Sequence, residues 1–171
     1  MKSTFALLAG ATSALVLTFN PSAAVASDGH GHDLIRSDLT PSLPTNDPIN
    51  GVKPGGLPWQ IDEGRVRVRA DGRMDVRIEG LEIPRNGTVD NPIAKIHAVL
   101  YCDGTFAAES GPQTMTTGVG PGFGDARFRV MVAVPETCDH ASVLIQPDNP
   151  TAPGTPAPAY IASAFASGDD D

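Results

Sequence analysis

The chain has 171 residues, with 12 Lys or Arg against 20 Asp or Glu, which gives a formal net charge of -8. This acidic balance provides no general electrostatic attraction to nucleic acid or to anionic lipid, so both are excluded as expected partners. The length is sufficient for one domain with a substantial core but not for two.

Residues 1–26 have the layout of a secretory signal peptide. Lys2 provides the basic start, residues 5–19 form a mainly apolar run, and residues 24–26 are the small side chains that a cleavage site needs. The apolar run is too short to cross a bilayer as a helix. We therefore expect a mature chain that begins at Ser27, is secreted to the extracellular side and has no membrane span.

Residues 27–56 are rich in Asp, Gly, Pro, Thr and Asn and show no apolar periodicity. Such a composition buries too little apolar surface to offset the entropy of ordering, so we expect a disordered acidic arm. At its start, Asp28, His30 and His32 place two imidazoles and a carboxylate close together. Imidazole suits Cu²⁺, Ni²⁺ and Zn²⁺, so one hypothesis is loose binding of these metals; the other is a solvated leader with incidental affinity.

Alternation of polar and apolar residues with period two begins after the arm. It predicts two strands, over residues 65–70 and 73–79, each with one wet face. Further candidate strands cover residues 93–102, 113–117, 126–134, 142–146 and 160–165. About seven strands without a helical stripe indicate an all-β, antiparallel, immunoglobulin-like β-sandwich over residues 57–167, followed by an acidic tail at 168–171.

The turn between the first two strands fixes their register. A three-residue loop, with Gly72 in the left-handed conformation, pairs Val68 with Met74 and places every apolar residue of both strands on the inner face. A two-residue loop would place Val68 beside Asp75, which contradicts the alternation. We therefore predict the three-residue loop.

This register gathers arginines on the outer face of the hairpin. They are Arg65, Arg67, Arg69, Arg73 and Arg77, and Arg127 and Arg129 lie on the polar side of another strand. Three interpretations stay open. The face is solvated and paired with scattered carboxylates, or the acidic arm folds over it, or it binds a partner such as an anionic cell-envelope polymer or another protein. The acidic residues of the arm are Asp28, Asp33, Asp38 and Asp47.

The chain has two cysteines, Cys102 and Cys138. In an oxidising compartment, the simplest arrangement is one intramolecular disulfide. The two residues are far apart in sequence and form no Cys-x-x-Cys motif, so we interpret the pair as structural and not as a redox or metal site.

No motif for catalysis is present: the chain has no Gly-x-Ser-x-Gly elbow, no His-Glu-x-x-His and no phosphate-binding glycine loop. His97 and His140 are the only histidines of the expected domain, and neither has a nucleophile nearby in sequence. We expect no enzymatic activity, with a hydrolase as the distant alternative. The single tryptophan, Trp59, is expected to plug one end of the sandwich.

Several segments resemble a group of small exported proteins from actinobacteria. They are Pro58-Trp59-Gln60-Ile61, residues 65–81 with their Ala-Asp-Gly-Arg turn, Leu100-Tyr101-Cys102-Asp103-Gly104 and Val134-Pro135-Glu136-Thr137-Cys138. The resemblance implies export, a β-sandwich and the disulfide. It implies no functional residue, because that group has no established activity.

We therefore expect a secreted, non-enzymatic β-sandwich protein that serves as an extracellular binding or envelope-associated module. The alternative function is loose Cu, Ni or Zn binding through the His-rich arm; no other cofactor is expected.

Overall fold

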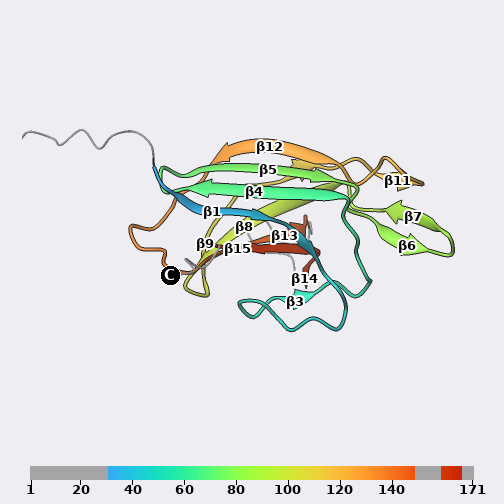
Figure 1. Cartoon of the computed structure of the whole chain (residues 1–171), viewed down its shortest axis with the longest axis horizontal. Coiled ribbons are helices and arrows are strands. Elements are labelled where there is room, and N and C mark those ends of the chain that lie inside the picture. The colour runs from blue at the N-terminus through green and yellow to red at the C-terminus, as the bar shows by residue number, and fades with distance from the viewer. Residues whose placement is uncertain (1–30, 149–158, 167–171) are drawn as a thin grey trace, which may run out of the picture.

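The computed structural model describes residues 31–148 and 159–166. The regular elements within these ranges are 15 β-strands. Two main sheets lie in layers, one above the other (Figure 1). The expected all-β class and antiparallel pairing are therefore confirmed, whereas the expected signal peptide (1–26) and acidic tail (168–171) lie outside the described residues. The part of the chain that is described contains no helix with the length and apolar character of a membrane span.

The first sheet has the order β1-β4-β5-β12, with all neighbours antiparallel. Its strands are β1 (Asp33–Asp38), β4 (Glu63–Arg69), β5 (Arg73–Glu79) and β12 (Ala126–Met131).

The second sheet has the order β10-β8-β13-β15-β2, and β9 also pairs with β8. Its strands are β2 (Thr40–Pro41), β8 (Lys95–Cys102), β9 (Thr105–Glu109), β10 (Gln113–Thr114), β13 (Ala141–Pro147) and β15 (Ala162–Phe165).

Two small sheets complete the fold. One is antiparallel and contains β6 (Ile83–Arg85), β7 (Thr88–Asn91) and β11 (Gly118–Val119), and the other is a parallel pair of β3 (Lys53–Pro54) and β14 (Ala159–Tyr160). The β6–β7 hairpin projects from the end of the two main layers (Figure 1).

The main core lies between the two large sheets. The first sheet contributes Val66, Val68, Met74, Val76 and Ile78, and the second contributes Ile96, Ala98, Leu100, Val143 and Ile145. Trp59 is buried in the same core, in agreement with its expected packing role. Because the inner faces of both sheets share one apolar cluster, the arrangement is sandwich-like.

A second, smaller core covers the opposite face of the second sheet. It contains Val99, Tyr101, Leu144 and Tyr160. The hydroxyl of Tyr160 donates a 3.1 Å hydrogen bond to the carbonyl oxygen of Asp47, and burial raises the pKa of the phenol. This contact attaches the loop before β3 to β14.

The predicted register of the first hairpin is confirmed. Val68 faces Met74 and Val66 faces Val76, and all four side chains are buried. Gly72 has φ +89° and its amide donates to the carbonyl of Arg69. The alternation of valine and arginine therefore determined the register.

The prediction of a disordered arm over residues 27–56 is wrong for the part that the structure describes. Residues 33–38 form β1, and Ile35 within it is only 1% exposed in the main core. Leu39, just after β1, is buried in the same cluster. The order comes from pairing with β4, a distant segment, which the composition of the arm alone does not reveal.

The expected strand set is also incomplete. Strands β1, β2, β3, β6, β7, β9 and β11 do not appear among the expected strands. The segment 113–117 keeps only two residues as β10, and 160–165 divides into β14 and β15.

Candidate functional site

The outer face of the first sheet is lined with arginines because β4 and β5 alternate strictly. Val66 and Val68 face the core, so Arg65, Arg67 and Arg69 face outward. The same period in β5 and β12 places their arginines on the same side.

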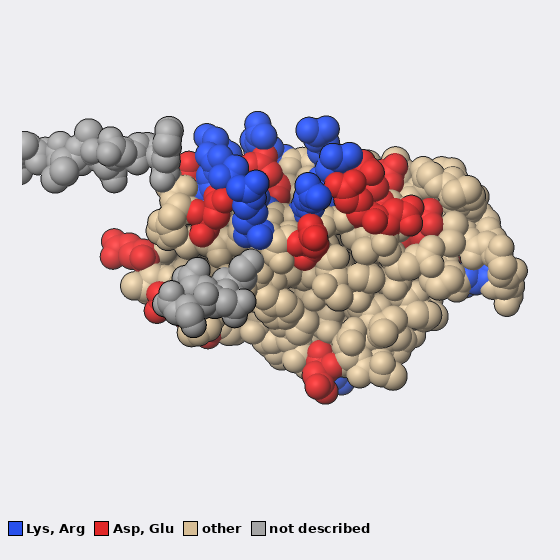
Figure 2. Space-filling view, in the orientation of Figure 1, with Lys and Arg blue, Asp and Glu red and all other residues tan. Residues whose placement is uncertain are grey.

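Most of the arginine in the chain is on this one surface. Of the 12 basic residues, three are lysines and nine are arginines. The outer face carries eight of these nine, which we call the arginine face: Arg36, Arg65, Arg67, Arg69, Arg73, Arg77, Arg127 and Arg129. Figure 2 shows basic side chains rising from this layer, with acidic side chains between them. Arg85, on β6, is the exception.

The strand register brings arginines of neighbouring strands directly opposite one another. Arg77 on β5 faces Arg65 on β4 and Arg127 on β12, so three arginines form one rung across the sheet. Arg36 faces Arg67 in the next rung. Like charges directly opposite on a sheet repel each other, so these arginine pairs destabilise the fold.

Carboxylates neutralise part of the arginine face. The Arg67 side chain donates a 2.7 Å hydrogen bond from Nε to Asp33 Oδ1, and this contact holds the pKa of Asp33 below its usual value. Arg69 Nε lies 3.9 Å from the same carboxylate oxygen. Asp75 pairs with Arg129 from the neighbouring strand.

Two further pairs lie at the end of the sheet where β4 begins. Arg77 Nη2 lies 2.6 Å from Glu79 Oε1, and Arg65 Nε lies 3.4 Å from Asp38 Oδ1. The side chains of the second pair are 70% and 83% exposed. Exposed pairs of this kind contribute little to stability, and salt screens them.

Three members of the face have no such partner. Within residues 31–148 and 159–166, no carboxylate oxygen lies within 4.0 Å of the guanidinium of Arg36, Arg73 or Arg127. A hollow of about 1000 Å³ lies over the face, lined by arginines of β1, β4, β5 and β12. The arrangement therefore leaves accessible cationic groups beside a concave surface.

The hypothesis that the acidic arm folds over the arginine face is not what the structure shows, although Asp33 and Asp38 of that segment pair with arginines of the face. They do so as part of strand β1 and not as a mobile cover. Asp47 lies elsewhere, at the second core, and Asp28 lies outside the described residues.

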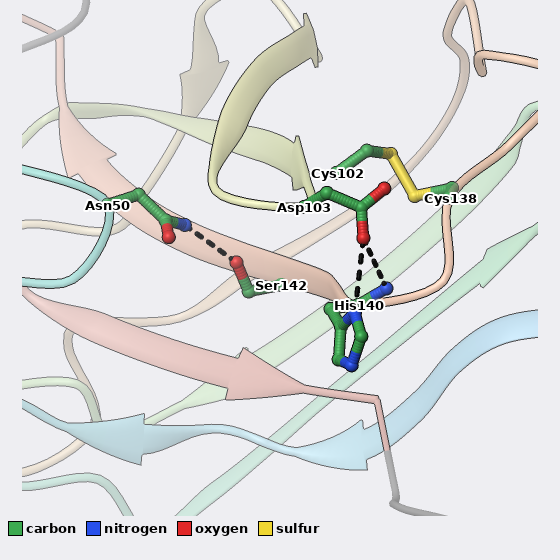
Figure 3. The surroundings of a disulfide bond; sticks show 6 residues. All are labelled: Asn50, Cys102, Asp103, Cys138, His140 and Ser142. Carbon is green, nitrogen blue, oxygen red and sulfur yellow. Dashed lines mark hydrogen bonds and ion pairs between the residues drawn. A yellow bond between two sulfur atoms is a disulfide. The ribbon is translucent and has the colours of Figure 1, made fainter.

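The expected disulfide is present between Cys102, at the end of β8, and Cys138, with Cα atoms 4.9 Å apart. Beside it, Asp103 Oδ1 accepts a 3.0 Å hydrogen bond from the main-chain nitrogen of His140 and lies 3.1 Å from its Nδ1 (Figure 3). These contacts with His140 lower the pKa of Asp103. The bridge and the Asp103–His140 contacts join β8 to the segment before β13.

Neither histidine of the domain is placed as the base of a serine or cysteine nucleophile. His97 lies between Asp148, 2.9 Å from its Nε2, and Glu109, 3.7 Å from its Nδ1. The hydroxyl of Ser142 on β13 accepts a hydrogen bond from the side chain of Asn50 instead (Figure 3). No hydroxyl or thiol of the described residues hydrogen-bonds to a ring nitrogen of His97 or His140.

The metal hypothesis falls largely on residues outside the structure. Asp28 and His30 lie beyond the described ranges. His32 is exposed, and its carbonyl accepts a hydrogen bond from the amide of Ala70. Among the residues that are described, no three His, Cys, Asp or Glu side chains are grouped to hold a metal ion.

Sequence reasoning found five arginines of the hairpin and the two of β12, but it missed Arg36. Arg36 lies on the outer face only because residues 33–38 form β1, and the polar composition of this segment predicted disorder instead. The strand Asp33–Asp38 does carry a local signal, since Ile35 and Arg36 alternate between the core and solvent.

Comparisons with protein-family models, with curated proteins and with solved structures give no match for this chain.

Proposed function

We propose that this protein is an exported, non-enzymatic binding module with an immunoglobulin-like β-sandwich, and that the arginine face attaches it to an anionic polymer of the cell envelope. Export is supported by the composition of residues 1–26 and by the Cys102–Cys138 disulfide, a bond that persists in oxidising compartments.

One observation carries this proposal: the rung of Arg65, Arg77 and Arg127 on an acidic protein. Each pair of like charges directly opposite on a sheet costs roughly a few tenths of a kcal/mol, up to about 1 kcal/mol. Local conflicts of this kind in a folded protein concentrate at functional positions. A polyanion would remove the repulsion, since its charges would lie between the guanidinium groups.

The use of arginine without lysine on this face also supports recognition of oxyanions. The guanidinium group presents a rigid fork of donors that matches carboxylate and phosphate geometry, whereas lysine provides a single point charge. Among the described residues the lysines are Lys53 on β3 and Lys95 on β8, and neither belongs to the first sheet.

The test is retention of the exported chain on immobilised dextran sulfate at about 50 and about 200 mM salt. Retention is expected at the lower salt and loss at the higher. Replacing Arg36, Arg73 and Arg127 together by Gln should abolish retention without removing any ion pair of the described fold. The matched control is Arg85→Gln, which removes an arginine from β6 and should leave retention unchanged. A wild-type chain that passes through the column at the lower salt would refute the proposal.

A further inference from the structure

We propose that Arg65, Arg77 and Arg127 form a subsite for a phosphate monoester carried by the polymer. This inference rests on the proposed function, because it names the chemical group that the arginine face recognises. The proposed subsite places the main binding contacts on one rung of the sheet and not on the whole arginine face.

The register places the three side chains side by side. Arg77 faces Arg65 on one neighbouring strand and Arg127 on the other, and all three line the hollow over the sheet. Adjacent strands lie about 4.8 Å apart. One group held above the central Arg77 is therefore within reach of long side chains from both flanking strands.

The ion pairs of the rung are exposed, and one of its three guanidinium groups has no carboxylate partner in the described residues. Arg77 pairs with Glu79 of its own strand, and the pairs that Arg65 makes with Asp38 and Glu63 are long, at 3.4 and 3.8 Å. Arg127 has no carboxylate partner within the described ranges. A ligand that engages this rung does not need to displace a buried ion pair.

A phosphate monoester fits such a rung better than a carboxylate does. It carries about -1.5 to -2 charges at neutral pH and has three acceptor oxygens, so it accepts from guanidinium groups of more than one strand. One guanidinium fork satisfies both oxygens of a carboxylate. A carboxylated polymer also competes with the resident carboxylates, which are present at high effective concentration because they belong to the same chain.

The experiment compares three probes that share one backbone: phosphocellulose, cellulose sulfate and carboxymethyl cellulose, at matched charge density. The wild-type exported chain should bind phosphocellulose most tightly. Raising the pH from about 5 to about 7.5 should strengthen binding to phosphocellulose alone, because only the phosphate monoester gains charge there, with a second pKa of about 6.

Single substitutions locate the subsite. Arg77→Gln and Arg127→Gln should each weaken binding to phosphocellulose at least about fivefold. Arg73→Gln, on the same face but outside the rung, should weaken binding less than Arg127→Gln does, and Arg85→Gln, off the face, should change it less than about twofold. Near-wild-type unfolding curves of all four variants would show that the fold is intact.

Equal binding to carboxymethyl cellulose and phosphocellulose would overturn the inference, as would an Arg73→Gln effect as large as that of Arg127→Gln. Either result, together with salt-sensitive retention on dextran sulfate, leaves the proposed function in place. Absence of binding to all three celluloses and to dextran sulfate would refute both proposals.

Discussion

Arg67 Nε donates a 2.7 Å hydrogen bond to Oδ1 of Asp33, a residue that lies 34 positions earlier in the chain. The contact joins the outer faces of β1 and β4. On the inner side of the same two strands, Ile35 faces Val68, and both are buried. The carboxylate that neutralises Arg67 therefore belongs to a strand of the same sheet.

Replacement of Asp33 by Asn should lower the free energy of unfolding by about 0.5–1 kcal/mol at pH 7, the size expected for a partly exposed ion pair. Because the hydrogen bond from Arg67 lowers the folded-state pKa of Asp33, its contribution is complete above the reference value of 3.8. It is lost as the pH falls through the lower folded-state value.

Urea unfolding of wild type and Asp33→Asn from pH 7 down to about pH 2 measures this effect. The difference between the two proteins should shrink towards acid. Asp38→Asn is the control, because Asp38 pairs over a longer distance and is 83% exposed, so it should show a smaller difference. If wild type and Asp33→Asn differ in free energy of unfolding by the same amount at every pH, the Asp33 carboxylate does not stabilise the fold through its pair with Arg67.

Removal of the disulfide should destabilise the protein strongly. Cys102 and Cys138 are separated by 36 positions, and closing a loop of this size stabilises the fold by about 3–4 kcal/mol in the chain-entropy model. The double substitution to Ala should lower the urea midpoint accordingly. A loss below about 1 kcal/mol would show that the unfolded chain is not constrained as this model requires.

Two glycines with similar backbone angles should respond differently to alanine. Gly87 has φ +82° at the open tip of the β6–β7 hairpin, where an added Cβ meets no atom within 4 Å. Gly72 has φ +89°, but an added Cβ there would overlap the carbonyl oxygen of Val132. Gly87→Ala should therefore cost about 1–2 kcal/mol from the left-handed conformation alone, and Gly72→Ala about 3–5 kcal/mol.

Unfolding free energies of the two glycine variants, measured in urea, test this difference. If both substitutions lower the free energy of unfolding by the same amount, the carbonyl oxygen of Val132 does not pack closely against Gly72.

The β4–β5 hairpin could be predicted at the level of single residue pairs because its signal is local. Valine and arginine alternate, and only one loop length places every valine inside. The β6–β7 and β8–β9 hairpins have local signals too: Asn86-Gly87 and Asp103-Gly104 both have positive φ, as two-residue hairpin turns require. The expected strand set includes β8 but omits β6, β7 and β9, which contain proline, aspartate, asparagine or alanine, residues that are depleted in strands.

The arrangement of the arginine face could be predicted only in part. Arg65 and Arg77 are brought together by one short turn, so the sequence suffices. Arg127 reaches Arg77 only because β12 pairs with β5, a contact between distant segments. Arg36 reaches Arg67 through β1, whose pairing with β4 depends on the assembled core. Local periodicity assigns a residue to a face, but it does not provide the order of strands.

If the rung of arginines serves binding, removing its charge should relieve repulsion in the free protein. Arg127→Gln removes no ion pair of the described fold and leaves Arg77 with one like-charged neighbour fewer, so the free energy of unfolding should rise by about 0.2–1 kcal/mol at low salt. Arg129→Gln, two residues away on β12, removes the partner of Asp75 and should not stabilise. Urea unfolding at about 50 and about 500 mM salt measures both, and screening should remove the gain of Arg127→Gln. A loss of stability in that variant would show that Arg127 stabilises the fold, and the rung would then need no binding role to account for it.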